Sequence, residues 1–114
     1  SLAATNPTLY VSATGPVQAL LTDPQGHQKG LDSGGTAYDT IAGATATIEG
    51  GKNDFVIPNP SSGSYTLTLS GTQAGTVEIS IGYNDGTDGG TVESQSIKLY
   101  HSAGTQTFTF TTQQ

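Results

Sequence analysis

The chain has 114 residues and a mass of 11.6 kDa, which is the size of one domain. It carries three Lys, no Arg and nine acidic residues, for a formal net charge of −6, so it lacks the clustered cations that neutralise nucleic-acid phosphates. It has no Cys, which excludes disulfides, thiolate nucleophiles and Cys-ligated metal sites, and no apolar run approaches the roughly 18 residues of a membrane-spanning helix.

The order of apolar and polar residues indicates an all-β chain. Only 11% of the residues are charged, whereas Ser and Thr together number 30. Apolar residues alternate with Thr and Ser, most clearly over 64–70, 76–84 and 107–111. A period of two places one row of side chains in a core and the other in solvent, and β-branched Thr suits the exposed row of a strand. No stretch shows the 3.6-residue period of an amphipathic helix.

The first part of the chain is predicted to contain short strands separated by turns. Residues 1–7 carry little pattern and are interpreted as a tail or the end of a linker, so the domain is expected to span residues 8–114. Strands are predicted over 8–13, 17–22 and 27–31. Residues 23–26 (Asp-Pro-Gln-Gly) have the chemistry of a type I turn, in which the Asp side chain accepts backbone hydrogen bonds.

The middle of the chain has a weaker pattern. Residues 38–48 are predicted to hold one broken strand, with Ile41, Ala44 and Ile48 facing inward. The Ala-Gly-Ala sequence at 42–44 indicates a bulge or a close approach of another backbone.

The second half of the chain alternates more regularly. Strands are predicted over 54–58, 64–70, 76–84, 92–100 and 105–112. Val92 is out of phase with Ile97 and Leu99, which predicts a β-bulge over 93–96.

These strands predict an antiparallel β-sandwich of seven or eight strands, of immunoglobulin-like type. A jelly roll is the alternative. The chain has neither a Cys pair nor a Trp, so an antibody-type domain is excluded.

Three segments resemble one family of domains. Residues 15–26 read GPVQALLTDPQG, residues 57–72 read IPNPSSGSYTLTLSGT, and residues 38–44 read YDTIAGA, with Ala42 where the family usually has Pro. In these segments the chain resembles the small immunoglobulin-like or pre-peptidase-like β-sandwich modules of bacterial secreted and cell-surface multidomain proteins. The resemblance implies an accessory domain of a larger exported protein, with no catalytic role of its own.

The turn at 59–63 makes a separate prediction about Tyr65. This turn reverses the chain just before the predicted strand 64–70, and Tyr65 lies near the start of that strand. The tyrosine hydroxyl is therefore expected to bond back toward the turn, as in the tyrosine corner of immunoglobulin-like sandwiches.

The acidic loop at 84–90 is the candidate metal site. Asn84, Asp85 and Asp88 offer oxygen ligands among glycines, a composition that could hold Ca²⁺. Glu93 does not stand at the spacing of an EF-hand, and Asx-type turns use the same residues. A calcium site and a plain hairpin loop therefore both remain open, and no other cofactor is expected.

Other chemistry has weaker support in the sequence. His27 and His101 lie near turns and are expected at the surface, and the chain has no Gly-x-Ser-x-Gly motif, so an enzyme is not expected. Lys98 is expected to point outward and Lys52 to lie in a loop, which disfavours a Lys isopeptide crosslink.

Sugar binding would need aromatic rings, and Tyr10, Tyr38 and Tyr100 are the candidates, since Tyr65 and Tyr83 fit the core. The expected function is a non-catalytic structural or interaction module, secreted or at the cell surface, whose partners are other domains of its parent chain. The alternative is a carbohydrate- or calcium-binding module. No nucleic acid and no membrane span are expected.

Overall fold

The computed structural model describes residues 6–84, 86 and 92–112. The chain forms ten β-strands. They are β1 (Thr8–Thr14), β2 (Gln18–Thr22), β3 (Gln28–Leu31), β4 (Ala37–Asp39), β5 (Thr45–Glu49), β6 (Lys52–Pro58), β7 (Gly63–Gly71), β8 (Gly75–Asn84), β9 (Val92–His101) and β10 (Gly104–Thr112). Among the described residues there is no helix with the length and apolar character needed to cross a membrane.

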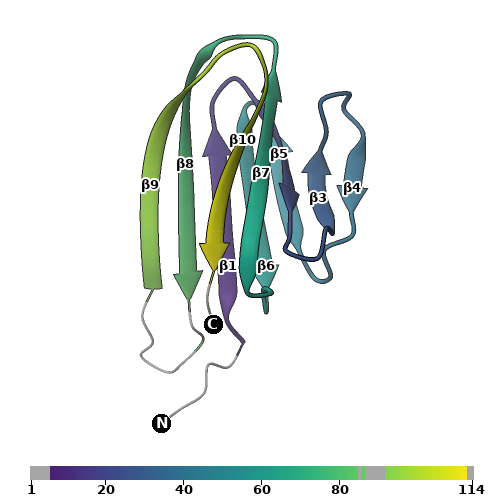
Figure 1. The fold of residues 1–114 in the computed structure, drawn as a ribbon, viewed down its shortest axis with the longest axis vertical. Helices are drawn as coiled ribbons and strands as arrows, with labels where there is room; N and C mark the ends of the chain where they lie inside the picture. Colours follow the sequence, from purple (N-terminus) through teal and green to yellow (C-terminus); the bar gives the residue numbers. More distant parts are fainter. Residues whose placement is uncertain (1–5, 85, 87–91, 113–114) are drawn as a thin grey trace.

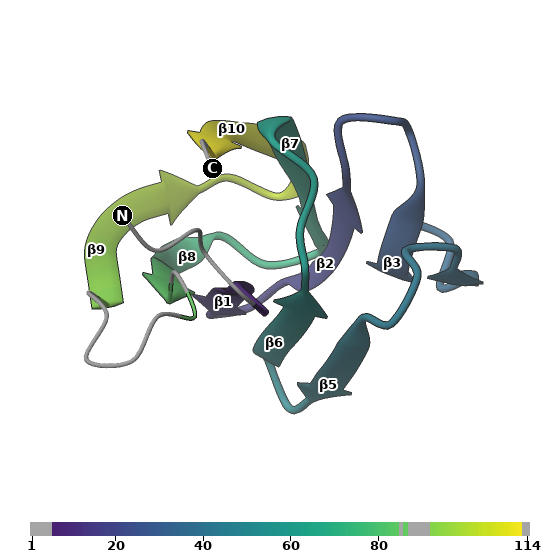
Figure 2. The same cartoon turned by 90° about the horizontal axis from the view of Figure 1, so that it is seen from below.

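The strands form two antiparallel sheets of five strands each, which confirms the predicted all-β sandwich (Figure 1). Sheet A has the order β5-β6-β1-β8-β9, and sheet B has the order β10-β7-β2-β3-β4. Figure 2 shows the two sheets as opposing layers, with β6, β1 and β8 on one side and β7, β2 and β3 on the other. The core between them consists of the inward rows of both sheets, including Leu9, Val11, Phe55, Leu67 and Ile79.

The strand order corresponds closely to that of an immunoglobulin variable-type sandwich. Sheet B matches the order G-F-C-C′-C″, with β10, β7, β2, β3 and β4 in those places. In sheet A, β5, β6 and β1 match strands D, E and B, and the hairpin β8–β9 stands on the side where strand A would lie. The immunoglobulin-like prediction therefore describes the topology better than the jelly-roll alternative.

The structure has ten strands rather than the predicted seven or eight, and one of the additional strands arises because residues 38–48 form two strands instead of one. This segment leaves sheet B after β4 and joins sheet A as β5. Ile41 and Ala44 lie at the crossing and are buried, as predicted, whereas Ile48 is only partly buried. Gly43, with φ +74°, makes the turn between the two sheets.

The bulge predicted over 93–96 is wrong. Strands β8 and β9 pair without interruption from Gly75↔His101 to Asn84↔Val92. Val92 pairs with Asn84 within this uninterrupted register, although its position in the sequence is out of phase with Ile97 and Leu99.

The connections gather at the two ends of the sandwich. Strand β1 begins and β10 ends at the same end, which we call the terminal end (Figure 1). The turns β2–β3 and β6–β7 also lie there. The opposite end, which we call the distal end, carries the turns β1–β2, β5–β6, β7–β8 and β9–β10.

Candidate functional site

Of the predicted acidic loop at 84–90, the structure describes only Asn84 and Gly86. Asn84 is the last residue of β8, and its Oδ1 accepts a hydrogen bond from the backbone N–H of Gly86 at 2.9 Å. Gly86 has φ +78°, so this contact is of the Asx-turn kind. Asp85 and Asp88 lie outside the described residues. The described part of the chain holds no group of three or more acidic, His or Cys side chains that could bind a metal ion, and the calcium site stays a prediction.

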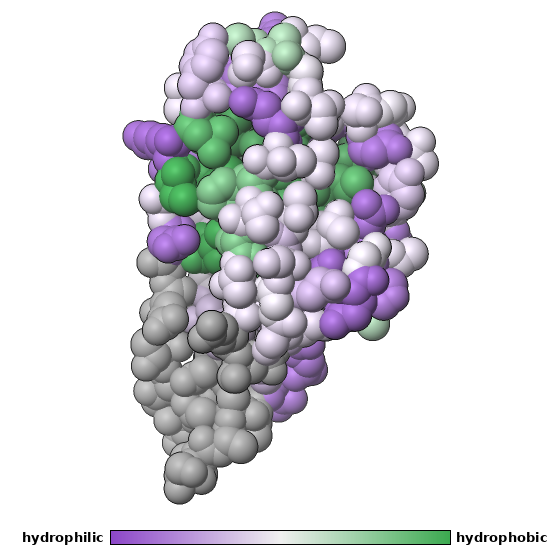
Figure 3. Space-filling view, viewed as in Figure 1, coloured by the Kyte–Doolittle hydropathy of each residue, from purple (hydrophilic) through white to green (hydrophobic). Residues whose placement is uncertain are grey.

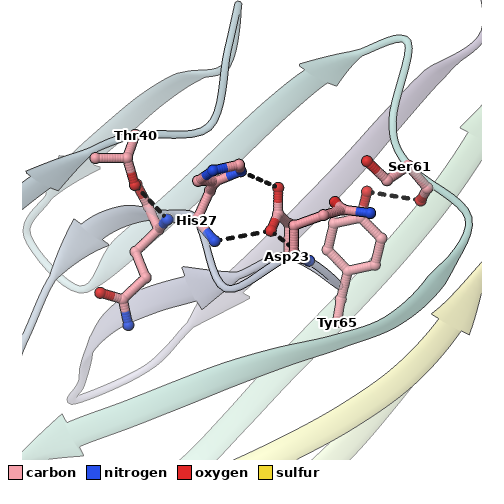
Figure 4. Close-up of polar contacts among 7 residues, drawn as sticks. Asp23, His27, Thr40, Ser61 and Tyr65 are labelled. Atoms are coloured by element: carbon pink, nitrogen blue, oxygen red, sulfur yellow. Dashed lines mark hydrogen bonds and ion pairs between the residues drawn. The ribbon is translucent and has the colours of Figure 1, made fainter.

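A polar cluster at the terminal end is built around Asp23 (Figure 4). Asp23 is only 8% exposed, and its Oδ1 accepts hydrogen bonds from the N–H groups of Gln25 (2.9 Å) and His27 (2.8 Å). The Gly26 N–H bonds to the Asp23 carbonyl at 3.0 Å. These bonds confirm the expected role of Asp23 as the residue that organises the β2–β3 turn.

Tyr65 forms the predicted tyrosine corner beside this turn. Its fully buried ring packs in the core, and its hydroxyl donates to the Ser61 carbonyl at 2.9 Å. The Thr112 hydroxyl donates to the same carbonyl at 3.1 Å. Burial, and then the nearby Asp23 charge, raise the pKa of Tyr65 to about 12, so the phenol stays neutral at physiological pH.

These groups border a pocket of about 330 Å³, but their contacts are structural. His27 is exposed, as predicted, and its Nδ1 lies 3.4 Å from Asp23 Oδ2. Within the described residues no Ser or Thr hydroxyl is hydrogen-bonded to the His27 ring, so the arrangement lacks the nucleophile–base contact of a hydrolase. The cluster therefore acts as a cap on two turns.

His101 is fully buried, so the prediction of a surface histidine is wrong for this residue. Its Nδ1 lies 3.3 Å from the Gln73 carbonyl and its Nε2 lies 3.2 Å from the Gly104 carbonyl. The ring thus joins the β7–β8 turn to the β9–β10 turn at the distal end. The signal was present in the sequence, because His101 is in phase with Ile97 and Leu99 along β9.

Asn53 is a second buried polar residue that sequence reasoning missed. It is 0% exposed, in phase with Phe55 and Ile57, and its side chain bonds only to backbone groups. These groups belong to the end of β1, the β1–β2 connection and the start of β2, so Asn53 holds this part of the chain against β6.

Lys52 and Lys98 lie on the outer face of sheet A. Lys98 is exposed, as predicted, while Lys52 is the first residue of β6 rather than part of a loop. The registers place both in one row across the sheet, in the order Glu49, Lys52, Thr14, Glu78, Lys98. All five residues of this row are exposed, which gives no support to a buried isopeptide bond.

The candidate sugar-binding tyrosines do not form one platform. Tyr10 (45% exposed) and Tyr100 (67% exposed) both face outward from sheet A. Tyr10 pairs with Gly82 and Tyr100 with Thr76, which stand six residues apart on β8, or roughly 20 Å along the strand. Tyr38 lies on the other sheet, where its hydroxyl donates to Asp32 Oδ2 at 3.1 Å. Tyr10 and Tyr100 are therefore too far apart to stack on one sugar, and Tyr38 is on a different sheet from both.

The larger pocket lies at the distal end and encloses about 680 Å³. Its wall is neutral apart from Glu49 and includes the polar side chains of Gln18, Ser33, Ser70 and Thr105. The Ser70 hydroxyl is buried and has no hydrogen-bond partner among the described residues.

Glycines let the backbone segments that line this pocket approach one another closely. A Cβ on Gly15 would stand 2.7 Å from the Thr76 carbonyl oxygen, and a Cβ on Gly71 would collide with the Pro16 carbonyl oxygen. The Gly15 N–H also bonds to the Gly51 carbonyl at 3.0 Å, which joins two of the distal turns. The pocket wall is therefore made largely of backbone held by close turn-to-turn contacts.

Comparison with known proteins gives no relative. No protein-family model matches the chain, and no match is found among curated proteins or among solved structures.

Proposed function

We propose that this chain is a non-catalytic interaction module, an accessory domain of an exported bacterial multidomain protein. The observation that carries the proposal is the use of the buried polar side chains. Of the five buried polar residues in the described part of the chain, all except Ser70 are hydrogen-bonded to backbone groups of turns or strand ends, namely Asp23, Asn53, His101 and Thr112. Catalysis needs side chains that converge on a substrate, and these side chains instead hold the fold together.

The positions of the strand ends support a display role. Strand β1 begins and β10 ends at the terminal end, so attachment to neighbouring domains at that end would leave the distal end facing outward (Figure 1). The larger pocket lies at this outward end. A tethered module would therefore present the distal pocket to a partner.

Carbohydrate binding is the second candidate function, and the chemistry of the distal pocket favours it. The wall offers hydroxyl, amide and backbone groups with one carboxylate, a set that suits a neutral polyhydroxylated ligand better than a charged one. The exposed tyrosines do not contribute, because none of them lines this pocket.

The non-catalytic proposal is tested by incubating the protein with chromogenic esters, glycosides and a labelled protein substrate. We expect rates equal to those in buffer for the natural chain and for Asp23→Asn. Turnover by the natural chain that Asp23→Asn or His27→Ala removes would contradict the proposal.

The carbohydrate candidate is tested by following backbone amide shifts on titration with neutral cello-, xylo- and chito-oligosaccharides. We expect shifts at Gly50, Gly51 and Gly104, and their loss in Ser33→Trp, which fills the distal pocket. Gln25→Trp, at an equally exposed position of the terminal end, is the matched control. If the amide shifts persist in Ser33→Trp but are lost in Gln25→Trp, the oligosaccharide binds at the terminal end and the assignment to the distal pocket is wrong.

A further inference from the structure

The two sheets have four edge strands, and one of them lacks the usual protection. Strand β4 has three residues, β5 contains Glu49, and β9 contains Glu93 and Lys98. Strand β10 has nine residues and contains no charged residue and no Pro. Its register with β7 runs without interruption from Gly104↔Gly71 to Thr112↔Gly63. Natural proteins normally blunt a long edge with a charge, a Pro or a bulge, because its free N–H and C=O groups pair with other strands.

The absence of charge extends inward from this edge. Strands β7 and β2, which follow β10 in sheet B, also contain no charged residue. The whole chain has a net charge of −6, so two copies repel each other in most orientations. When two copies approach each other along the side of sheet B that β10, β7 and β2 form, no charged residue of these three strands opposes another.

The side chains of β10 are complementary to themselves. Phe108 and Phe110 face the interior, while Thr107, Thr109 and Thr111 are exposed on the outer face. An antiparallel pair of two β10 strands on a two-fold axis places Phe beside Phe on the inner face and Thr beside Thr on the outer face. Aromatic pairs and Thr pairs are both favourable across strands.

The inner side of this edge is incompletely covered. Phe108 is only partly buried, as is Leu99 on β9, the edge strand of the opposite sheet. Figure 3 shows hydrophobic surface on the side of the molecule viewed in Figure 1, where β9 and β10 lie. A strand added beside β10 would bring a second Phe108 over this surface.

We propose that a second copy of this chain adds to β10 in antiparallel orientation. The two copies of sheet B then form one continuous sheet of ten strands across a two-fold axis. This is strand addition at a sheet edge, in which backbone hydrogen bonds supply affinity and the alternating side chains supply register. It does not depend on the proposed function, since neither pocket is lined by residues of β10 beyond Gly104 and Thr105.

The test measures the mass of the 114-residue chain by analytical ultracentrifugation over a range of concentrations. We expect a monomer–dimer equilibrium. The double substitution Thr107→Lys with Thr109→Lys puts like charges opposite each other across the two-fold axis, and should raise the dimer dissociation constant by at least about tenfold. The matched control is Thr45→Lys with Thr47→Lys, which adds the same charge to exposed positions of the edge strand β5 and should leave the equilibrium in place.

A charge-swap mixture separates edge pairing from a folding defect. The variant Thr107→Glu with Thr109→Glu should be monomeric like the Lys variant, and an equimolar mixture of the two should recover the dimer. A natural chain that is monomeric at all concentrations, or a dimer that both β10 variants leave intact, would overturn the proposal. Failure of the mixture to associate, with both variants folded, would also overturn it.

Discussion

The side-chain Oδ1 of Asn53, on β6 of sheet A, accepts a hydrogen bond from the backbone N–H of Ala19, on β2 of sheet B, at 3.1 Å. The Nδ2 of the same amide donates to the carbonyls of Ala13 and Val17, each at 3.0 Å. One buried amide therefore joins the end of β1, the connection that leaves it and the strand that receives it. These hydrogen bonds are buried at the passage between the two sheets.

Replacing Asn53 with Leu, which is close in size, should lower the free energy of unfolding by about 2–4 kcal/mol, because buried N–H and C=O groups left without partners cost about 1–3 kcal/mol each. Urea unfolding followed by circular dichroism measures the loss. Thr47→Leu, at an exposed position on β5, should change stability by no more than about 0.5 kcal/mol. Equal stabilities of the Asn53→Leu variant and the natural chain would show that the amide is dispensable.

The tyrosine corner predicts an alkaline pH dependence. Since the folded-state pKa of Tyr65 is raised from 10.0 to about 12, the neutral phenol's contribution is fully present below pH 10 and is lost as the pH rises to 12. At pH 7, Tyr65→Phe should cost about 1 kcal/mol, the usual net value of one hydrogen bond. The stability difference between the natural chain and this variant should then narrow between pH 10 and pH 12.

The control for this profile is Thr112→Val, which removes the other hydroxyl that donates to Ser61. Its stability deficit contains no phenol ionisation, so it should stay constant over the same pH range. Parallel profiles for Tyr65→Phe and the natural chain would contradict the assigned pKa.

A comparison of Gly30 with Gly26 separates the cost of a steric clash at an added Cβ from the cost of placing a non-glycine residue at positive φ. Both have positive φ (+120° and +89°), but a Cβ on Gly30 would collide with the Ala19 carbonyl oxygen, whereas a Cβ on Gly26 meets nothing within 4 Å. We expect Gly26→Ala to cost about 1 kcal/mol and Gly30→Ala at least about 3 kcal/mol. Thermal unfolding of both variants measures the difference, and similar melting temperatures would refute the close approach of β3 to β2.

The predicted calcium loop is tested by thermal unfolding in millimolar Ca²⁺ and in EDTA. Since the Asn84 Oδ1 already accepts the Gly86 N–H, we expect the same Tm in both solutions. A cation present at 100 times its Kd would instead add about 2.7 kcal/mol, which is several degrees of Tm for a domain of this size. A rise of that kind, removed by Asp85→Ala or Asp88→Ala, would establish the metal site.

Local alternation was sufficient to predict β7 and its buried face. Tyr65, Leu67 and Leu69 alternate with Ser and Thr, and all three are buried in the core. The Pro-rich turn before Tyr65 also predicted its hydroxyl bond, because a tyrosine corner depends on residues close together in the chain.

Features that depend on distant partners were not predicted. Asn53 and His101 are polar, and residue type alone favours the surface for both. They are buried because carbonyl groups from other turns meet them at the distal end. The split of residues 38–48 has the same origin, since which sheet a short strand joins depends on neighbours far away in the sequence.

The position of β1 has a consequence for how the chain folds as it is made. Strand β1 is synthesised before the other nine strands, yet it lies inside sheet A, where Val11 pairs with Phe55 of β6 on one side and Ile81 of β8 on the other. Strand β6 begins at Lys52 and β8 at Gly75, so both pairings close long loops, which slows folding. A nascent chain that ends before β8 therefore carries β1 with one edge unpaired, and sheet A is completed late in synthesis.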